Sequence, residues 1–287
     1  AVALDQAAPG ALLPEAVAQD KPKKDTRETR RTPALRNKVY ERLAEAQTLA
    51  EAKDYPGASA ILNDMISEDG KRALNSYELA NVYNLHAFLS YATEDYSQSL
   101  RYYEQVIAQP DIPLAMEINT RFTIAQLYFV QERWQQGIDA LLMWFEMNEK
   151  PNAGAYVLLA QGYYQVKRYD LALDNVETAI SMHEGEGKLP KEQWYNLARF
   201  LYFDKEDFDS ALDVLNTLII YYPKKQYWVQ ASHLYGEKKD EPRQLALMEA
   251  AYEQGFLDRS SELVTMAYLY LNAEAPYYAG AVIEKGF

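Results

Sequence analysis

The stretch AGAYVLLAQGYYQVKRYDLALDNVETAI, residues 153–180, decides the secondary structure of this chain. From Ala153 to Val166 its apolar residues recur at steps of three and four, and the same spacing returns from Leu171 to Ile180 after a short polar turn. Because an α-helix has about 3.6 residues per turn, this spacing places the apolar side chains on one helix face. The stretch therefore predicts two helices joined by a tight turn.

The turn in this stretch recurs along the chain as a charged residue followed by an aromatic one. The recurrences are Asp54-Tyr55, Asp95-Tyr96, Arg133-Trp134, Arg168-Tyr169 and Asp207-Phe208. Successive aromatic residues are 41, 38, 35 and 39 positions apart, and Tyr277 follows 69 positions after the last, which leaves room for one more repeat. Such phased recurrence is typical of stacked helical repeats, whereas an irregular helical bundle, the alternative, rarely produces it.

Small residues stand at fixed distances from these aromatic residues. Three positions after them come Ala58, Ser99, Gly137, Ala172, Ala211 and Gly280, and nine positions before the first four come Ala46, Ala87, Ala125 and Ala160. Two antiparallel helices approach closely only where their facing side chains are small. We therefore expect the aromatic residues to be mainly packing residues, with Trp134, the largest, wedged between the third and fourth repeats.

With this order of aromatic and small positions, the sequence resembles the tetratricopeptide family, whose unit is a helix-turn-helix of 34 residues. The resemblance implies an all-α fold, a tandem helix-turn-helix solenoid of about seven repeats with a right-handed superhelical twist. We expect a flexible N-terminal arm at 1–37 and the solenoid at 38–287, with repeats at about 39–68, 80–111, 118–150, 153–187, 192–224, 225–256 and 260–287. The sixth repeat matches least, because Glu241-Pro242 stands where the turn aromatic belongs.

The formal net charge of −13 is distributed unevenly along the sequence. Residues 21–38 carry eight bases and two acids, whereas residues 39–287 carry a net charge of −16. An acidic body repels phosphate backbones, so we expect no nucleic-acid partner. The bases of the arm would contact an anionic membrane surface or an acidic partner, or else belong to a solvated linker. Those assigned to the basic arm are Lys21, Lys23, Lys24, Arg27, Arg30 and Arg31.

Motifs for catalysis or for a cofactor are missing from the sequence. There is no cysteine, and the three histidines, His86, His183 and His233, lie in different repeats without the spacing of metal ligands. Gly185 and Gly187 follow no predicted strand and lack the lysine of a phosphate-binding loop. We therefore expect a protein with no enzymatic activity, no metal and no cofactor, and we interpret His86 as a packing residue.

In tetratricopeptide proteins the inner face of each repeat's first helix lines a concave groove, and this resemblance supplies our candidate binding surface. Its side chains here are amides and aromatic residues, which suit an extended peptide and its apolar side chains. The alternative is that half of the aromatic residues pack between neighbouring repeats. The candidate groove residues are Asn84, Phe88, Tyr91, Asn119, Phe122, Gln126, Phe129, Gln161, Tyr164, Gln165, Asn196, Phe200, Phe203 and Gln230.

Several stretches also resemble one subgroup, the periplasmic repeat proteins encoded beside TonB, ExbB and ExbD in Gram-negative bacteria. These stretches are NSYELANVYNLHAFLSY, IAQLYFVQE, AYVLLAQGYYQ, YYPKKQYW and SELVTMAYLYL. The resemblance implies a scaffold or accessory role in TonB-dependent uptake, with TonB, ExbB or ExbD components as partners. The alternatives are an adaptor for cell-wall synthesis or outer-membrane assembly and the regulatory half of an enzyme.

The beginning of the sequence bears on location in the cell. The chain opens on the Ala/Pro-rich stretch AVALDQAAPGALLPEAVAQ, which resembles the mature end that signal-peptide cleavage leaves. This opening leads us to expect a periplasmic protein whose signal peptide has been removed, and the lack of cysteine is compatible with an oxidising compartment.

Overall fold

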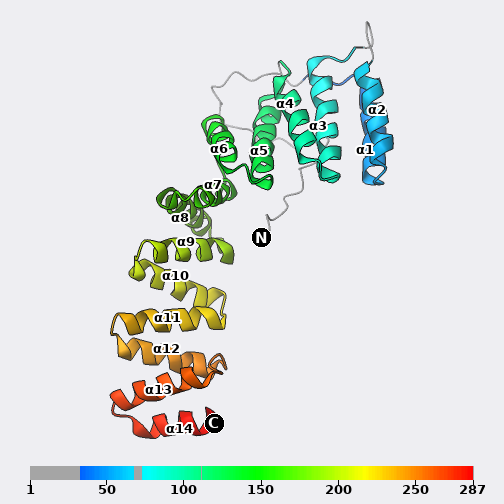
Figure 1. Ribbon diagram of the computed structural model, residues 1–287. Coiled ribbons are helices and arrows are strands. Elements are labelled where there is room, and N and C mark those ends of the chain that lie inside the picture. The colour runs from blue at the N-terminus through cyan, green and yellow to red at the C-terminus, as the bar shows by residue number, and fades with distance from the viewer. Residues whose placement is uncertain (1–32, 68–72, 111, 287) are drawn as a thin grey trace. The chain divides into compact units, whose positions relative to one another are not determined.

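The computed structural model describes residues 33–67, 73–110 and 112–286, and this part of the chain consists of fourteen helices without a strand. The described helices belong to two compact halves of the chain, and the division falls between Pro151 and Asn152. Figure 1 shows the helices of each half as consecutive antiparallel pairs. Fourteen helices are consistent with about seven repeats of two helices each, while the right-handed superhelix stays a prediction.

The N-terminal half contains the first three helix pairs. These are α1 (Asn37–Glu51) with α2 (Tyr55–Ser67), α3 (Ser76–Ala92) with α4 (Tyr96–Ala108), and α5 (Leu114–Val130) with α6 (Trp134–Met147).

The C-terminal half contains the other four pairs. These are α7 (Ala153–Gln165) with α8 (Tyr169–Gly185), α9 (Glu192–Asp204) with α10 (Phe208–Tyr221), α11 (Lys225–Glu237) with α12 (Glu241–Glu253), and α13 (Ser260–Asn272) with α14 (Pro276–Gly286).

The same turn joins the two helices of every pair. Two residues before each second helix, a lysine or glutamate has a left-handed backbone, with φ between 57° and 62°. The next residue donates its N–H to the carbonyl five positions earlier, over 2.8 to 2.9 Å in all seven turns. This pattern is the Schellman motif, which pairs carbonyl groups that a helix end leaves open. The left-handed residues are Lys53, Glu94, Glu132, Lys167, Glu206, Lys239 and Glu274.

The charged residue before each turn aromatic has a structural role where it is aspartate. Asp95 caps α4 by accepting the N–H of Gln98 at 2.9 Å, and Asp207 caps α10 by accepting the N–H of Ser210 at 3.1 Å. Such a cap is worth about 1 kcal/mol because it satisfies a free N–H of the first turn. Arg133 makes no side-chain cap bond, so in the third repeat the charged residue before the aromatic does not cap its helix.

The small residues lie where the helices of a pair touch, as their spacing predicted. Ala46, Ala87, Ala125 and Ala160 have 0% exposed surface, as do Ala58, Ser99, Ala172 and Ala211. In the second pair the Ser99 hydroxyl donates to the carbonyl of Ala87 at 2.8 Å, which joins α4 to α3 directly. Close approach of the paired helices therefore depends on these positions.

The seventh repeat differs from the sequence-based alignment by one residue. Helix α14 begins at Pro276, two residues after the left-handed Glu274, so proline holds the position of the turn aromatic. Three residues later Ala279 is 5% exposed, whereas Gly280, the predicted contact residue, is exposed. Aligning the repeat on the aromatic Tyr277, which is 82% exposed, caused this shift.

Trp134 packs within its own repeat. Its ring lies 6.1 Å from that of Phe129 on α5, and its side chain is half-buried. The buried tryptophan of the N-terminal half is Trp144, which is 4% exposed and lies 4.8 Å from Phe122. The described ring contact of Trp134 closes the α5–α6 turn of its own repeat, and the expected wedge between repeats three and four stays a prediction.

Arg36, predicted to belong to the flexible arm, is fixed to the second helix pair. Its guanidinium binds both carboxylate oxygens of Glu78, with Nε at 2.8 Å and Nη2 at 2.6 Å, and also donates to the carbonyl of Ala73. Glu78 has 0% exposed surface and forms a capping box with Asn75. Burial alone raises the pKa of Glu78, but hydrogen bonds from Arg36 and from the Asn75 backbone outweigh it and hold the pKa below its ordinary value.

Candidate functional site

The candidate groove residues of the N-terminal half lie on α3 and α5, and their aromatic rings pack against other helices. Phe88 lies against the core formed by α1, α2 and α3. Tyr91 is 5.5 Å from Tyr96 and Phe122 is 4.8 Å from Trp144, between ring centres. All three candidate rings are half-buried. Phe88 packs against the neighbouring first repeat, as the alternative interpretation expected, whereas the ring contacts of Tyr91 and Phe122 lie within their own repeats.

Phe129 is a packing residue and not an accessible part of the candidate groove. It is 3% exposed, and its ring lies against Trp134 and against the backbone of Gly137 on α6. A Cβ added at Gly137 would lie 3.0 Å from the ring of Phe129. The small residue of the third repeat therefore makes room for Phe129, which leaves this side chain no surface for a partner.

In the C-terminal half the structure brings candidate residues of neighbouring repeats together. The ring of Tyr164 on α7 meets that of Phe200 on α9 edge to face, with centres 5.4 Å apart. Tyr164 also stacks on Tyr169 at 5.7 Å, which holds it in place. Phe200 remains 44% exposed. Burying an apolar side chain contributes about 25 cal/mol of stabilising free energy for each Å² removed from water, so a partner that covers this ring would gain such a contribution. Tyr164 and Phe200 thus form an accessible aromatic pair, which we call the aromatic pair.

The amides of α9 and α11 are joined by a residue that the sequence analysis did not single out. Arg199 donates from Nη2 to Oδ1 of Asn196 at 3.1 Å and from Nη1 to Oε1 of Gln230. Asn196 in turn donates to the hydroxyl of Tyr227 at 2.8 Å. These residues form a hydrogen-bonded network, the amide network, between two first helices. The amide network and the aromatic pair are adjacent in sequence, since Arg199 of the network directly precedes Phe200 of the pair.

The position of Arg199 explains why sequence reasoning missed it. It stands nine residues before Phe208, where the first four repeats have a buried alanine. A long cation at a position that is otherwise small is a departure from the repeat pattern, and this departure was the available signal. Burial lowers the pKa of Arg199, although the nearby Tyr227 partly offsets it. Among the described residues, no carboxylate forms an ion pair with its guanidinium.

The amide network is bounded by an ion pair at the start of α9. Glu192 accepts hydrogen bonds from Lys224 and from the hydroxyl of Tyr227. Both bonds, first that from Lys224, hold the pKa of Glu192 below its ordinary value. The network thus extends from the ion pair of Glu192 and Lys224 at the start of α9 to the half-buried Gln230 on α11. Its polar groups are hydrogen-bonded to one another.

The remaining candidate residues take less distinctive places. Phe203 packs on Phe208, the turn aromatic of its own repeat, with ring centres 6.2 Å apart. Asn119 and Gln165 are exposed, and three further amides are half-buried, namely Asn84, Gln126 and Gln161. The basic residues Lys21, Lys23, Lys24, Arg27, Arg30 and Arg31 lie outside the described residues. The candidate groove residues whose contacts join neighbouring repeats in an accessible place, those of the aromatic pair and the amide network, therefore lie on α7, α9 and α11.

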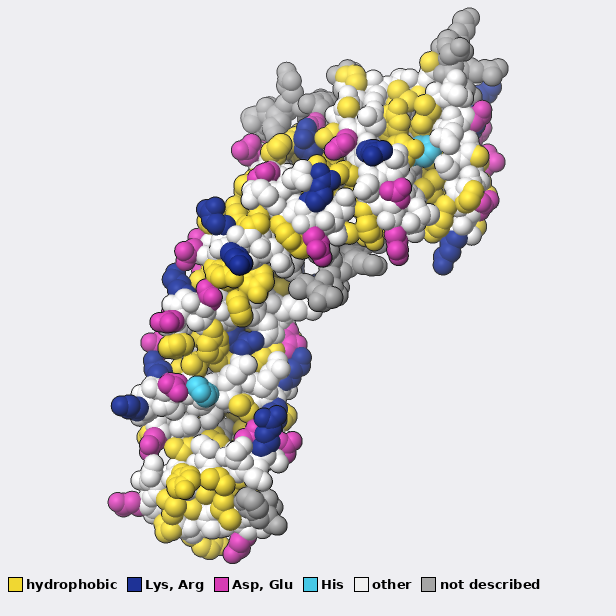
Figure 2. Space-filling model, viewed as in Figure 1, with side chains coloured by type: hydrophobic (Ala, Val, Ile, Leu, Met, Phe, Trp, Pro, Cys, Tyr) yellow, Lys and Arg dark blue, Asp and Glu magenta, His cyan; other side chains and the backbone are white. Residues whose placement is uncertain are grey.

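Two further observations concern the rest of the described chain. No cluster of three or more histidine, aspartate or glutamate side chains in this part is arranged to hold a metal ion. None of its helices combines the length and the apolar character needed to cross a bilayer. Figure 2 shows hydrophobic side chains gathered over α13 and α14, where Tyr268, Leu271, Tyr277 and Tyr278 are exposed.

Comparison with solved structures identifies the fold. A tetratricopeptide repeat protein from Parabacteroides merdae ATCC 43184 superposes with a TM-score of 0.51 at 14% identity, covering 86% of this chain and 91% of that one. The apo form of RapI gives 0.51 at 10% identity over 87% and 96% of the two chains. MamA gives 0.50 at 17% identity over 61% and 91%. No protein-family model and no curated protein sequence matches the chain.

These likenesses, together with the seven consecutive helix pairs of the described chain, show the tetratricopeptide-repeat fold.

Proposed function

We propose that this chain is a non-catalytic scaffold that binds protein partners through the first-helix face of α7, α9 and α11. The observation that carries the proposal is the aromatic pair, in which Phe200 is exposed yet held edge-on by Tyr164. A fixed aromatic ring supplies apolar contact area at little cost in side-chain entropy. The half-buried amide of Gln161 on α7 offers both a donor and an acceptor to a peptide backbone, whereas Gln230 on α11 offers its N–H donors, because its Oε1 accepts from Arg199.

We further propose that the partner belongs to a TonB-dependent uptake system and that the chain acts in the periplasm. Support for this comes from the sequence resemblance of stretches such as AYVLLAQGYYQ and YYPKKQYW to periplasmic repeat proteins encoded beside TonB, ExbB and ExbD. The second of these stretches includes Tyr227 of the amide network. The candidate partners are therefore TonB, ExbB or ExbD components.

The test measures binding of the full chain to the periplasmic domain of a TonB-like partner by isothermal titration calorimetry. Phe200→Ser should weaken binding at least tenfold, because truncating a central aromatic anchor commonly costs 2 kcal/mol or more. Phe208→Ser is the matched control, since Phe208 is 39% exposed but lies at the start of the second helix α10. Circular dichroism checks that both variants keep their helices.

Equal losses from Phe200→Ser and Phe208→Ser would contradict the binding face, since both would then act through stability. A second comparison uses a variant in which uncharged residues replace four bases of the arm, Lys23, Lys24, Arg30 and Arg31. If only these changes abolish binding, in a salt-dependent way, the arm is the binding element. Absence of binding to any TonB, ExbB or ExbD domain would contradict the choice of partner.

A further inference from the structure

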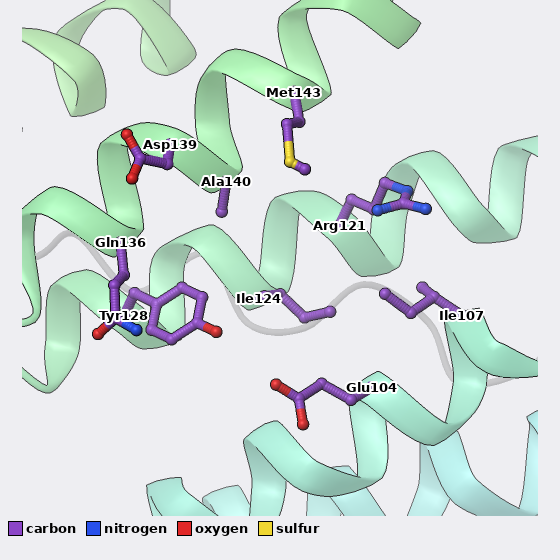
Figure 3. Close-up of a pocket in the computed structure, with 9 residues that line it drawn as sticks. All are labelled: Glu104, Ile107, Arg121, Ile124, Tyr128, Gln136, Asp139, Ala140 and Met143. Atoms are coloured by element: carbon purple, nitrogen blue, oxygen red, sulfur yellow. The ribbon is translucent and has the colours of Figure 1, made fainter.

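A cavity of about 310 Å³ opens between α4, α5 and α6 in the N-terminal half. Figure 3 shows the side chains around it, with Ile107 from α4, Ile124 from α5, and Ala140 and Met143 from α6 directed into the space. Its volume is at the lower end of the range for small-molecule sites, about 300 to 1,000 Å³. The space therefore suits one or two apolar side chains of a partner.

This cavity lies on the opposite side of α5 from the candidate groove. The candidate groove residues on this helix that remain at least partly exposed are Asn119, Phe122 and Gln126, whereas the cavity is lined by Arg121, Ile124 and Tyr128. At about 100° per residue, the mean directions of these two sets differ by roughly 160°. The cavity is thus a second surface, independent of the proposed binding face.

The floor of the cavity is apolar and adaptable. Ile124 is 7% exposed and forms part of the core with α3 and α4, so the floor is fixed at this point. Met143 is 49% exposed and stands at the edge. An unbranched thioether fits irregular apolar surfaces at low cost, so Met143 is suited to close over an inserted side chain.

Basic groups near the cavity already have partners within α5 and α6. Arg121 binds Glu117 through Nε at 3.0 Å and Nη2 at 2.8 Å. Arg133 lies 4.6 Å above the centre of the Tyr128 ring and donates to Gln136 at 2.6 Å. The charge of Arg121 is thus balanced by Glu117, and Arg133 is held by ring and amide contacts without forming an ion pair with a rim carboxylate.

Two carboxylates at the rim have no such partner. Glu104 on α4 and Asp139 on α6 line the cavity from opposite sides, and within the described part of the chain no basic side chain pairs with either. Asp139 accepts only a neutral hydrogen bond, from Gln135 at 2.9 Å. The rim is therefore negative around an apolar floor.

We propose that this cavity is a docking site for a basic segment of a protein partner, which inserts one or two apolar side chains between α4 and α6. Lysine or arginine residues beside the inserted side chains pair with Glu104 and Asp139. Charge complementarity selects this occupant, because an acidic segment would bring like charges together at the rim. The inserted side chain rests on Ile107, Ile124 and Ala140 and is covered by Met143.

The test uses the full chain with ¹³C-labelled isoleucine and methionine methyl groups, observed by NMR. The probe is the peptide acetyl-KKLLKK-amide, with acetyl-KKSSKK-amide and acetyl-EELLEE-amide as comparisons. KKLLKK should shift the methyl signals of Ile107, Ile124 and Met143. KKSSKK should bind at least tenfold more weakly, because it lacks the apolar side chains, and EELLEE should cause no shift.

Two variants place the binding at the cavity. Replacing Glu104 by Gln and Asp139 by Asn together preserves shape and should weaken KKLLKK about fivefold, as expected for two exposed ion pairs. The matched control replaces Glu45 and Glu51, exposed on α1 of the same half, by Gln and should change binding less than twofold. Ala140→Phe fills the cavity and should abolish the shifts of Ile107 and Ile124.

The proposal is overturned if KKSSKK shifts the same methyl groups as strongly as KKLLKK, or if the control pair weakens binding as much as the rim pair. Either result would mean a general attraction to an acidic protein. Shifts that persist in Ala140→Phe, or that appear only at other methyl groups, would overturn it as well. Phe200→Ser should leave KKLLKK binding unchanged, so this test is separate from that of the proposed function.

Discussion

At the scale of single residues, His86 is the clearest case of a side chain that burial controls. It is 3% exposed, stacks on Tyr102 with ring centres 4.7 Å apart, and has a buried Nε2 without a hydrogen-bond partner among the described residues. Burial lowers its pKa from 6.5 to about 4, because the charged imidazolium would lose its hydration. The residue therefore serves packing, and its neutral form is the one that fits.

We expect His86→Phe to reduce the loss of stability in acid. Between pH 6.5 and about 4 the unfolded chain binds a proton at His86 and the folded chain does not. The free energy of unfolding is therefore unaffected by this group above pH 6.5 and falls as the pH decreases toward 4. The loss is about 2–3 kcal/mol. Urea unfolding at pH 7 and pH 4.5 should show a smaller difference for His86→Phe, since phenylalanine keeps the ring stacking and binds no proton.

His233→Gln is the control, because it removes a histidine whose side chain is 72% exposed. An equal acid loss in the wild type and in His86→Phe would contradict the burial argument.

At the scale of elements, the end of each first helix is the most regular feature of the chain. All seven Schellman turns place lysine or glutamate at a positive φ, where a Cβ clashes with the backbone and costs about 1 kcal/mol. The two hydrogen bonds of the motif offset this cost. In the sixth turn Lys239 donates to Gly236 and Asp240 to Tyr235, both at 2.9 Å.

We expect Lys239→Gly to raise the free energy of unfolding by about 1 kcal/mol and Lys239→Ala to leave it almost unchanged. Both substitutions remove the lysine side chain, but only glycine lacks the Cβ that makes φ of 57° unfavourable. Urea denaturation measures the difference. The neighbouring Lys238 has φ of −77°, so Lys238→Gly should lower stability relative to Lys238→Ala. If glycine were more stabilising than alanine at both positions, or less stabilising at both, the result would contradict the turn geometry.

The helices and their small contact residues were predictable from sequence because both follow a fixed spacing. The left-handed residues were not, because lysine and glutamate are ordinary helix formers and do not mark a positive φ as glycine does. The seventh repeat was misaligned by one residue because Tyr277 resembles the turn aromatic, whereas hydrogen bonding places Pro276 there. In the candidate site, the aromatic pair lies on predicted positions, whereas Phe129 is buried because Gly137 makes room for it.

At the scale of the whole molecule, the chain divides into two compact halves at Pro151 and Asn152. The sequence does not mark this division, because the spacing of 35 residues between Trp134 and Tyr169 continues the repeat pattern across it. Each half has its own buried clusters, for example that around Leu43 and Leu62 in the N-terminal half and that around Leu215 and Tyr227 in the C-terminal half. In repeat proteins stability is approximately a sum over repeats and nearest-neighbour interfaces.

We therefore expect each half to lose stability independently when its own core is damaged. Trp144→Ala removes a ring that is 4% exposed in the N-terminal half, and Trp194→Ala removes one that is 6% exposed in the C-terminal half. Each should cost about 3–5 kcal/mol, the usual range for a buried tryptophan.

Hydrogen exchange followed by mass spectrometry should show that Trp144→Ala speeds exchange in α1–α6 and leaves α7–α14 protected. Trp194→Ala should show the reverse, because local openings report the stability of the region that contains them. The two variants act as controls for each other, since both remove the same side chain from a comparable environment. Faster exchange in both halves from either substitution would mean that the fourteen helices unfold as one cooperative body.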